Sequence, residues 1–70
     1  SIPTKIQQIE NWIRENKLLL QNVKMNNLTF IQDLCTFLNV KDHRTVAKIL
    51  NVNNKKNLVT KLIEISKNIC

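Results

Sequence analysis

Basic side chains are concentrated in the second half of this 70-residue chain. Residues 41–70 hold seven of the eleven Lys and Arg residues and only two of the five acids. Positive charge at this density favours an anionic partner, and the phosphate backbone of a nucleic acid is the commonest one. The sequence thus predicts a phosphate-binding face made by five residues: Arg44, Lys48, Lys55, Lys56 and Lys61. A lysine-rich surface that only keeps the chain in solution is the alternative interpretation.

Two of these lysines stand at a predicted helix start. Asn53 or Asn54 is a suitable N-cap just before Lys55 and Lys56. Backbone N–H groups at a helix start point outward and the helix dipole favours anions, so the two lysines would reinforce a phosphate contact. Four asparagines nearby are either donors to phosphates and bases or helix caps and turn formers: Asn51, Asn53, Asn54 and Asn57. No Phe, Trp or Tyr interleaves with the basic residues, so base stacking is not expected.

The remaining reactive residues do not indicate catalysis or metal binding. His43, the only histidine, lies beside Asp42 at another predicted helix start, where a solvent-exposed or cap-region role is expected. A nucleophile–base pair would need a cysteine near His43, and Cys35 falls on a predicted core face. A zinc site normally takes four Cys or His ligands, and the chain has three such residues. We therefore expect no enzyme activity, metal, cofactor or small-molecule substrate.

Capping residues indicate the helices that would position the basic side chains. The chain has no glycine and one proline but eleven asparagines, a composition that lacks the residues of tight β-turns and retains helix caps. Four helices are predicted: Thr4 to about Leu20, Thr29 to Asn39, a short one after Asp42, and one after Asn53 or Asn54. The expected fold is a compact all-α domain of four helices with short loops, ending in a helical hairpin.

Apolar stripes support the same helices. The capping-box pattern T-x-x-Q opens the first two, at Thr4–Gln7 and Thr29–Gln32. The predicted stripes are Ile6, Ile9, Ile13 and Leu20 with Trp12 beside them, then Ile31, Leu34, Cys35 and Leu38 widened by Phe30 and Phe37, and finally Leu58, Leu62, Ile65 and Ile69. A core of this size supplies only about 3–5 kcal/mol.

Cysteine content and chain ends bear on location. Cys35 and Cys70 are too few for a secreted disulfide scaffold, so we expect a reduced intracellular protein, with a single disulfide as the alternative. No apolar run is long enough for a transmembrane helix, and we expect no membrane partner. Because the chain begins at Ser1 rather than Met, we expect residues 1–70 to be one domain of a larger protein. We expect that protein to be nuclear.

Residues 53–62 resemble a known family. The run NNKKNLVTKL is similar to the start of the second helix in SAP-type helix-extended-helix domains, and five of its residues match the family pattern without a gap: Lys55, Leu58, Val59, Lys61 and Leu62. The match covers ten of 70 residues. Asn53 replaces the family's turn glycine, and the preceding helix departs from the family's leucine spacing. The resemblance implies DNA or RNA binding by the lysines at this helix start.

The same region also resembles a helix-turn-helix motif, although more loosely. Residues 45–52 place Ala47 and Val52 at suitable positions, but Leu58 then falls one residue late.

The N-terminal half indicates a different partner. Trp12 and the Leu18-Leu19-Leu20 run present more apolar surface than one helical stripe buries, unless Trp12 simply closes the core. An exposed remainder would bind an acidic or amphipathic peptide or a neighbouring subunit through five residues: Trp12, Leu18, Leu19, Val23 and Met25. The sequence therefore predicts a nucleic-acid-binding accessory domain, with a protein–protein interaction module of a nuclear complex as the alternative.

Overall fold

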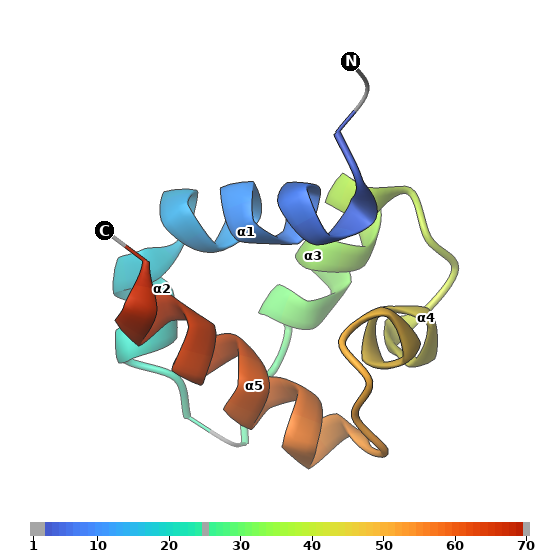
Figure 1. The fold of residues 1–70 in the computed structure, drawn as a ribbon. Helices are drawn as coiled ribbons and strands as arrows, with labels where there is room; N and C mark the ends of the chain where they lie inside the picture. The colour runs from blue at the N-terminus through green and yellow to red at the C-terminus, as the bar shows by residue number, and fades with distance from the viewer. Residues whose placement is uncertain (1–2, 25, 70) are drawn as a thin grey trace.

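Helices make up the architecture of residues 3–24 and 26–69, the part of the chain that this computed structural model describes. They are α1 (Lys5–Glu15), α2 (Lys17–Gln21), α3 (Phe30–Leu38), α4 (His43–Ile49) and α5 (Lys55–Asn68), shown in Figure 1. None of them is long and apolar enough to cross a membrane. The predicted all-α class is confirmed, and the number of helices exceeds the predicted four because the first predicted helix is divided.

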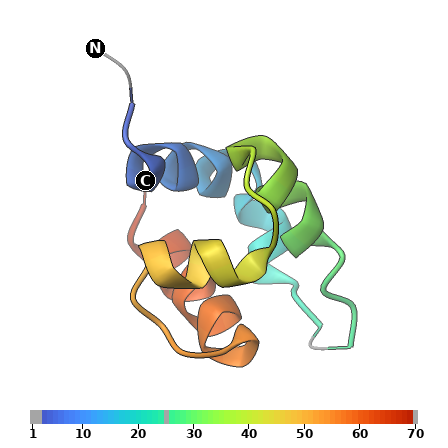
Figure 2. The same cartoon turned by 90° about the vertical axis from the view of Figure 1, so that its right-hand side faces the viewer.

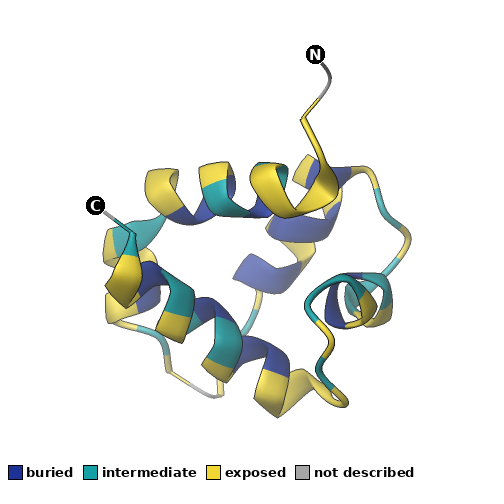
Figure 3. Ribbon diagram, in the orientation of Figure 1, coloured by how far each residue is buried: buried dark blue, intermediate teal, exposed yellow. Residues whose placement is uncertain are grey.

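The helices enclose one core. α1 packs against α3 and α5, α4 packs against the same two helices, and α2 lies between α1 and α5. α4 and α5 cross each other. Figure 1 looks along α4 while α5 runs across the view, and in Figure 2 α4 runs across the view while α5 is seen more nearly along its axis. Buried residues face inward from every helix and exposed residues face outward (Figure 3).

Asn16 divides the helix that was predicted to run from Thr4 to about Leu20, and this corrects that prediction. Its backbone leaves the helical range, with φ −116° and ψ 24°, and its side-chain amide donates to the Trp12 carbonyl at 2.8 Å. Asparagine side chains compete for local backbone groups in this way and disfavour helix interiors. Beyond the break Leu20 is buried, whereas Leu18 is 77% exposed.

Three helix starts confirm the predicted caps. Thr4 forms the complete capping box at the start of α1. The Asp42 carboxylate accepts the Arg44 N–H at 3.0 Å, and the Asn54 side chain accepts the Asn57 N–H at 2.8 Å. These bonds satisfy N–H groups that the first turn of a helix leaves without partners.

The capping box predicted at Thr29 and Gln32 is wrong. Thr29 has a helical backbone, with φ −61° and ψ −25°, and its hydroxyl donates to the Asn27 side chain at 3.2 Å instead. The end predicted at Asn39 is confirmed. Asn39 adopts the left-handed conformation, with φ 57°, and the N–H of Val40 then donates to the Cys35 carbonyl at 3.0 Å. This is a Schellman ending with asparagine in the usual place of glycine.

The core is formed by apolar residues from all five helices: Ile9, Trp12, Ile13, Leu20, Phe30, Ile31, Leu34, Cys35, Leu38, Val46, Leu58, Val59 and Leu62. The Trp12 and Phe30 rings stack with centroids 6.2 Å apart. Four residues predicted for the buried stripes lie outside this core. Ile6 is 51% exposed and Phe37 is 47% exposed, whereas Ile65 and Ile69 are partly buried and pack against the core. Ile6 lies in the first turn of α1. Phe37 lies next to the buried Leu38 in the last turn of α3, at the edge of the buried stripe.

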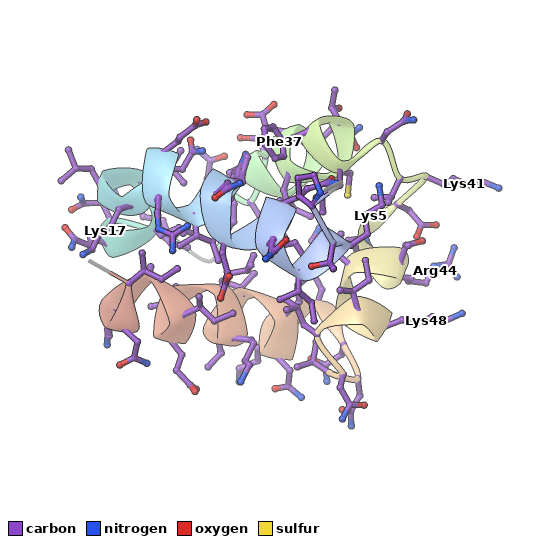
Figure 4. The ribbon with its side chains drawn as sticks, turned by 45° about the horizontal axis from the view of Figure 1, so that its top comes forward. Lys5, Lys17, Phe37, Lys41, Arg44 and Lys48 are labelled. Atoms are coloured by element: carbon purple, nitrogen blue, oxygen red, sulfur yellow. The ribbon has the colours of Figure 1, made fainter. Side chains whose placement is uncertain are left out.

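Two lysines join distant elements through backbone carbonyls. The Lys5 ammonium donates to the Leu38 carbonyl at 2.7 Å, and the Lys17 ammonium donates to the Ile69 carbonyl at 2.7 Å. Each carbonyl lies at a helix C-terminus, where a positive charge is favoured by the helix dipole. Both side chains are labelled in Figure 4. Lys5 and Lys17 therefore have structural partners within the fold.

Cys35 is a free thiol in the core, as predicted. Burial raises its pKa, and the Asp42 carboxylate raises it further. A protonated, buried thiol is unreactive, so Cys35 behaves as a small apolar residue. Cys70 lies outside the described residues.

Candidate nucleic-acid interface

A hollow of about 380 Å³ lies between α4 and the start of α5. Three basic side chains line it: Arg44, Lys48 and Lys55. The rest of the wall comes from His43, Ala47, Val52, Asn53 and Asn54. Within the described part of the chain, no acidic residue lines this hollow. Three of the five residues predicted to bind phosphate therefore meet at one place.

The turn between α4 and α5 creates this meeting point. Asn51 has a φ of 58°, in the left-handed region that asparagine adopts more readily than most residues. The Val52 N–H then donates to the Ala47 carbonyl at 2.9 Å, which ends α4 in a second Schellman motif. Because Asn54 caps α5 only two residues later, Lys55 lines the same hollow as Arg44 and Lys48.

The basic side chains of α4 lie on one face. Arg44 and Lys48 are four residues apart, which is one turn of helix. Figure 4 shows both projecting from the same edge of the molecule, together with Lys41. Lys41 is outside the predicted set, although its spacing of three residues from Arg44 was visible in the sequence.

Two predicted residues are not part of the hollow. Lys56 is exposed at the second position of α5. Lys61 lies six residues after Lys55, which places it about 9 Å further along the axis and on a different side of the helix. Its ammonium also pairs with the Glu64 carboxylate at 3.8 Å. The structure thus separates Lys61 from the other basic residues of the predicted face.

His43 is a wall residue that the sequence analysis did not assign to the site. It is the first residue of α4, half-buried, and it lines the hollow with Lys55. In the sequence, only its position next to Arg44 indicated that His43 could belong to this site. Among the described residues, no group of three or more His, Cys, Asp or Glu side chains is placed to hold a metal ion.

Asp42 places a negative charge next to the hollow. Its carboxylate lies 3.4 Å from the Arg44 guanidinium. Partial burial raises the pKa of the Asp42 carboxyl, but the backbone N–H and the guanidinium of Arg44, together with the Thr45 N–H, outweigh it and hold the pKa below its ordinary value. Asp42 is therefore ionised at neutral pH, both as the cap of α4 and as the partner of Arg44.

This lowered pKa predicts a specific loss of stability in acid. The stabilisation from the charged Asp42 is complete above the pKa of an unfolded-chain aspartate, about 3.9, and is lost as the pH falls through the lower pKa of the folded state. Asp42→Asn keeps a good N-cap and removes the charge. Between about pH 6 and about pH 2.5, the urea midpoint of the natural chain should fall further than that of the variant. Equal falls in the two midpoints would contradict this role of Asp42.

A second hollow, of about 310 Å³, lies where α2 leads into the loop before α3. Leu19 and Val23, two of the predicted partner-binding residues, line it together with Phe30. Leu18 lies outside its wall. Trp12 is only 4% exposed, so it closes the core and offers almost no surface to a partner. Met25 lies outside the described residues.

Comparisons with known proteins found no match. No protein-family model, no curated protein and no solved structure matches it. The SAP-type resemblance therefore stays a prediction from ten residues.

Proposed function

We propose that this domain is a non-catalytic nucleic-acid-binding module that contacts the phosphate backbone at the hollow between α4 and α5. The observation that carries the proposal is the meeting of Arg44, Lys48 and Lys55 around one hollow that no described acidic residue lines. In this proposal α4 and α5 act as the basic C-terminal hairpin expected from the sequence, and the SAP-type resemblance implies nucleic-acid binding by the lysines at the start of α5. The domain serves as an accessory part of a nuclear, nucleic-acid-processing protein.

The chemistry of the three side chains suits phosphate. A guanidinium donates two parallel hydrogen bonds to one phosphate, and the lysines act as point charges beside it. Arg44 can change partner readily, because its side chain is 80% exposed and an exposed ion pair such as that with Asp42 contributes little. α5 begins at Lys55, so the positive end of its dipole adds to the same field.

Salt dependence tests the proposal directly. Each neutralised phosphate contributes a slope of about −0.9 to log K against log salt for a duplex and about −0.7 for a single strand. Three contacts should therefore give a slope of about −2.7 or −2.1, measured by fluorescence anisotropy of a labelled oligonucleotide. A slope near zero, or no binding at low salt, would overturn the proposal.

A second candidate function is docking of a protein segment at α2. It is favoured by the exposure of Leu18 and Leu19 on a five-residue helix beside the second hollow. Lys24 lines that hollow, so an acidic amphipathic helix is the partner that it suits.

Trp12 provides the readout for this second candidate. Trp12 is buried, but it can respond to a ligand in the second hollow because its ring stacks on Phe30, which lines that hollow. A bound acidic amphipathic peptide should therefore shift the fluorescence of this single tryptophan, and Leu19→Ser should weaken the response. If a panel of such peptides leaves the emission unchanged, docking at α2 is excluded.

A further inference from the structure

We propose that the hollow between α4 and α5 receives an unpaired base, so that the nucleic acid bound by this domain is single-stranded. The inference rests on the proposed function and specifies its ligand. Arg44, Lys48 and Lys55 hold phosphates on either side of the inserted base.

The lining of the hollow is mostly apolar. Ala47, which is buried, and Val52, which is half-buried, contribute to it alongside the basic residues. A phosphate is strongly hydrated and gains nothing from contact with such groups, whereas a nucleobase has apolar faces that do. A volume of about 380 Å³ also exceeds what one phosphate occupies. The hollow therefore suits a base with its neighbouring phosphates better than it suits phosphate alone.

Planar and amide groups at the wall suit a base as well. The His43 imidazole and the Arg44 guanidinium are flat groups of the kind on which unpaired bases stack. The Asn53 amide carries a donor and an acceptor for the polar edge of a base. The Asn54 oxygen is already used by the Asn57 N–H at 2.8 Å, which leaves its amide hydrogens as donors. The expected absence of base stacking is revised in this proposal, because the His43 ring lies at the wall of the hollow.

The shape of the site favours a single strand over a duplex. A duplex keeps its bases stacked inside the helix and presents only their edges in grooves, which a projecting helix or strand enters. The hollow is instead a concave site between two helices. A group that enters it must project from the nucleic acid, as the bases of single strands do.

Three ligands of matched length test the inference on the unmodified chain. They are a single-stranded oligonucleotide, its duplex, and an abasic strand that keeps the phosphates and lacks the bases. We expect the single strand to bind at least about fivefold more tightly than the abasic strand, which corresponds to stacking of one base. In ¹⁵N-edited NMR spectra, the amide signals of Ala47 and Val52 should move with the single strand and stay in place with the abasic one.

A variant that fills the hollow adds an independent check. Ala47→Leu should reduce binding of the single strand to the level of the abasic strand, and its effect on folding is monitored by circular dichroism. If the variant fails to fold, the NMR comparison of the single strand with the abasic strand on the unmodified chain still tests the inference.

The outcomes separate this inference from the proposed function. Equal affinity for the single strand and the abasic strand, or tighter binding of the duplex, overturns the single-strand inference and supports phosphate binding. A free mononucleotide serves as a fourth ligand. If it binds as tightly as the single-stranded oligonucleotide, the inference that the bound ligand is a strand is overturned. Failure of all three long ligands to bind overturns both proposals.

Discussion

Replacing Leu62 with alanine should leave most of the chain unfolded near body temperature. Leu62 is completely buried near the middle of α5, the helix that packs against α1, α2 and α4. Leu→Ala changes in cores cost about 2–5 kcal/mol. A domain of this size holds only about 3–5 kcal/mol in total. The loss of one side chain is therefore comparable to the whole stability of the fold.

Leu18→Ala is the matched control for this prediction. It makes the same chemical change in a helix, at a side chain that is 77% exposed, and should alter the free energy of unfolding by no more than about 0.5 kcal/mol. Thermal and urea denaturation followed by circular dichroism would measure both variants. A Leu62→Ala protein with nearly natural stability would show that the core described here is wrong.

Replacing Arg44, Lys48 and Lys55 together with alanine should remove nucleic-acid binding almost entirely. Each side chain that neutralises a phosphate contributes about one log unit of affinity at about 50 mM salt. The triple variant should therefore bind at least about 100-fold more weakly and lose most of its salt dependence. Anisotropy titrations at two salt concentrations measure both effects, and the exposed positions of these residues should leave the fold intact.

A control variant with the same change in net charge tests whether location matters. Arg14, Lys24 and Lys67 are also one arginine and two lysines, all exposed and outside the hollow. Replacing these three with alanine should weaken binding less than about tenfold, because none of them lines the hollow and an exposed charge away from the contact is screened by salt. Equal losses in the two triple variants would show that net charge, rather than the hollow, drives binding.

Local chemistry made several features of the fold predictable. Helix starts at Thr4, Asp42 and Asn54 depend on a side chain that bonds to an N–H two or three residues later, so the sequence spacing indicated them, although the same spacing at Thr29 formed no capping box. The end of the second predicted helix at Asn39 follows from the tolerance of asparagine for a left-handed backbone. Such contacts span a few residues and need no tertiary partner.

Features that depend on distant contacts were not predictable in the same way. The break at Asn16 has a local bond to Trp12, but the contact beyond it is distant, because the Lys17 ammonium donates to Ile69, 52 residues away. The exposure of Ile6 and Phe37 depends on how α1 and α3 pack against the other helices. An apolar stripe indicates which side of a helix is buried and leaves open how far along the helix the burial extends.

The sequence by itself determined an all-helical chain with a basic C-terminal half and no pattern for catalysis. It also indicated which residues carry the charge. Only the tertiary structure decided which charges act together. It brought Arg44 and Lys48 to Lys55 across the turn at residues 50–54 and placed His43 in the same wall. It left Lys61 on another side of α5, paired with Glu64. The physical reason is that a helix distributes its side chains around its axis by local geometry, whereas a site is formed by the packing of one helix against another.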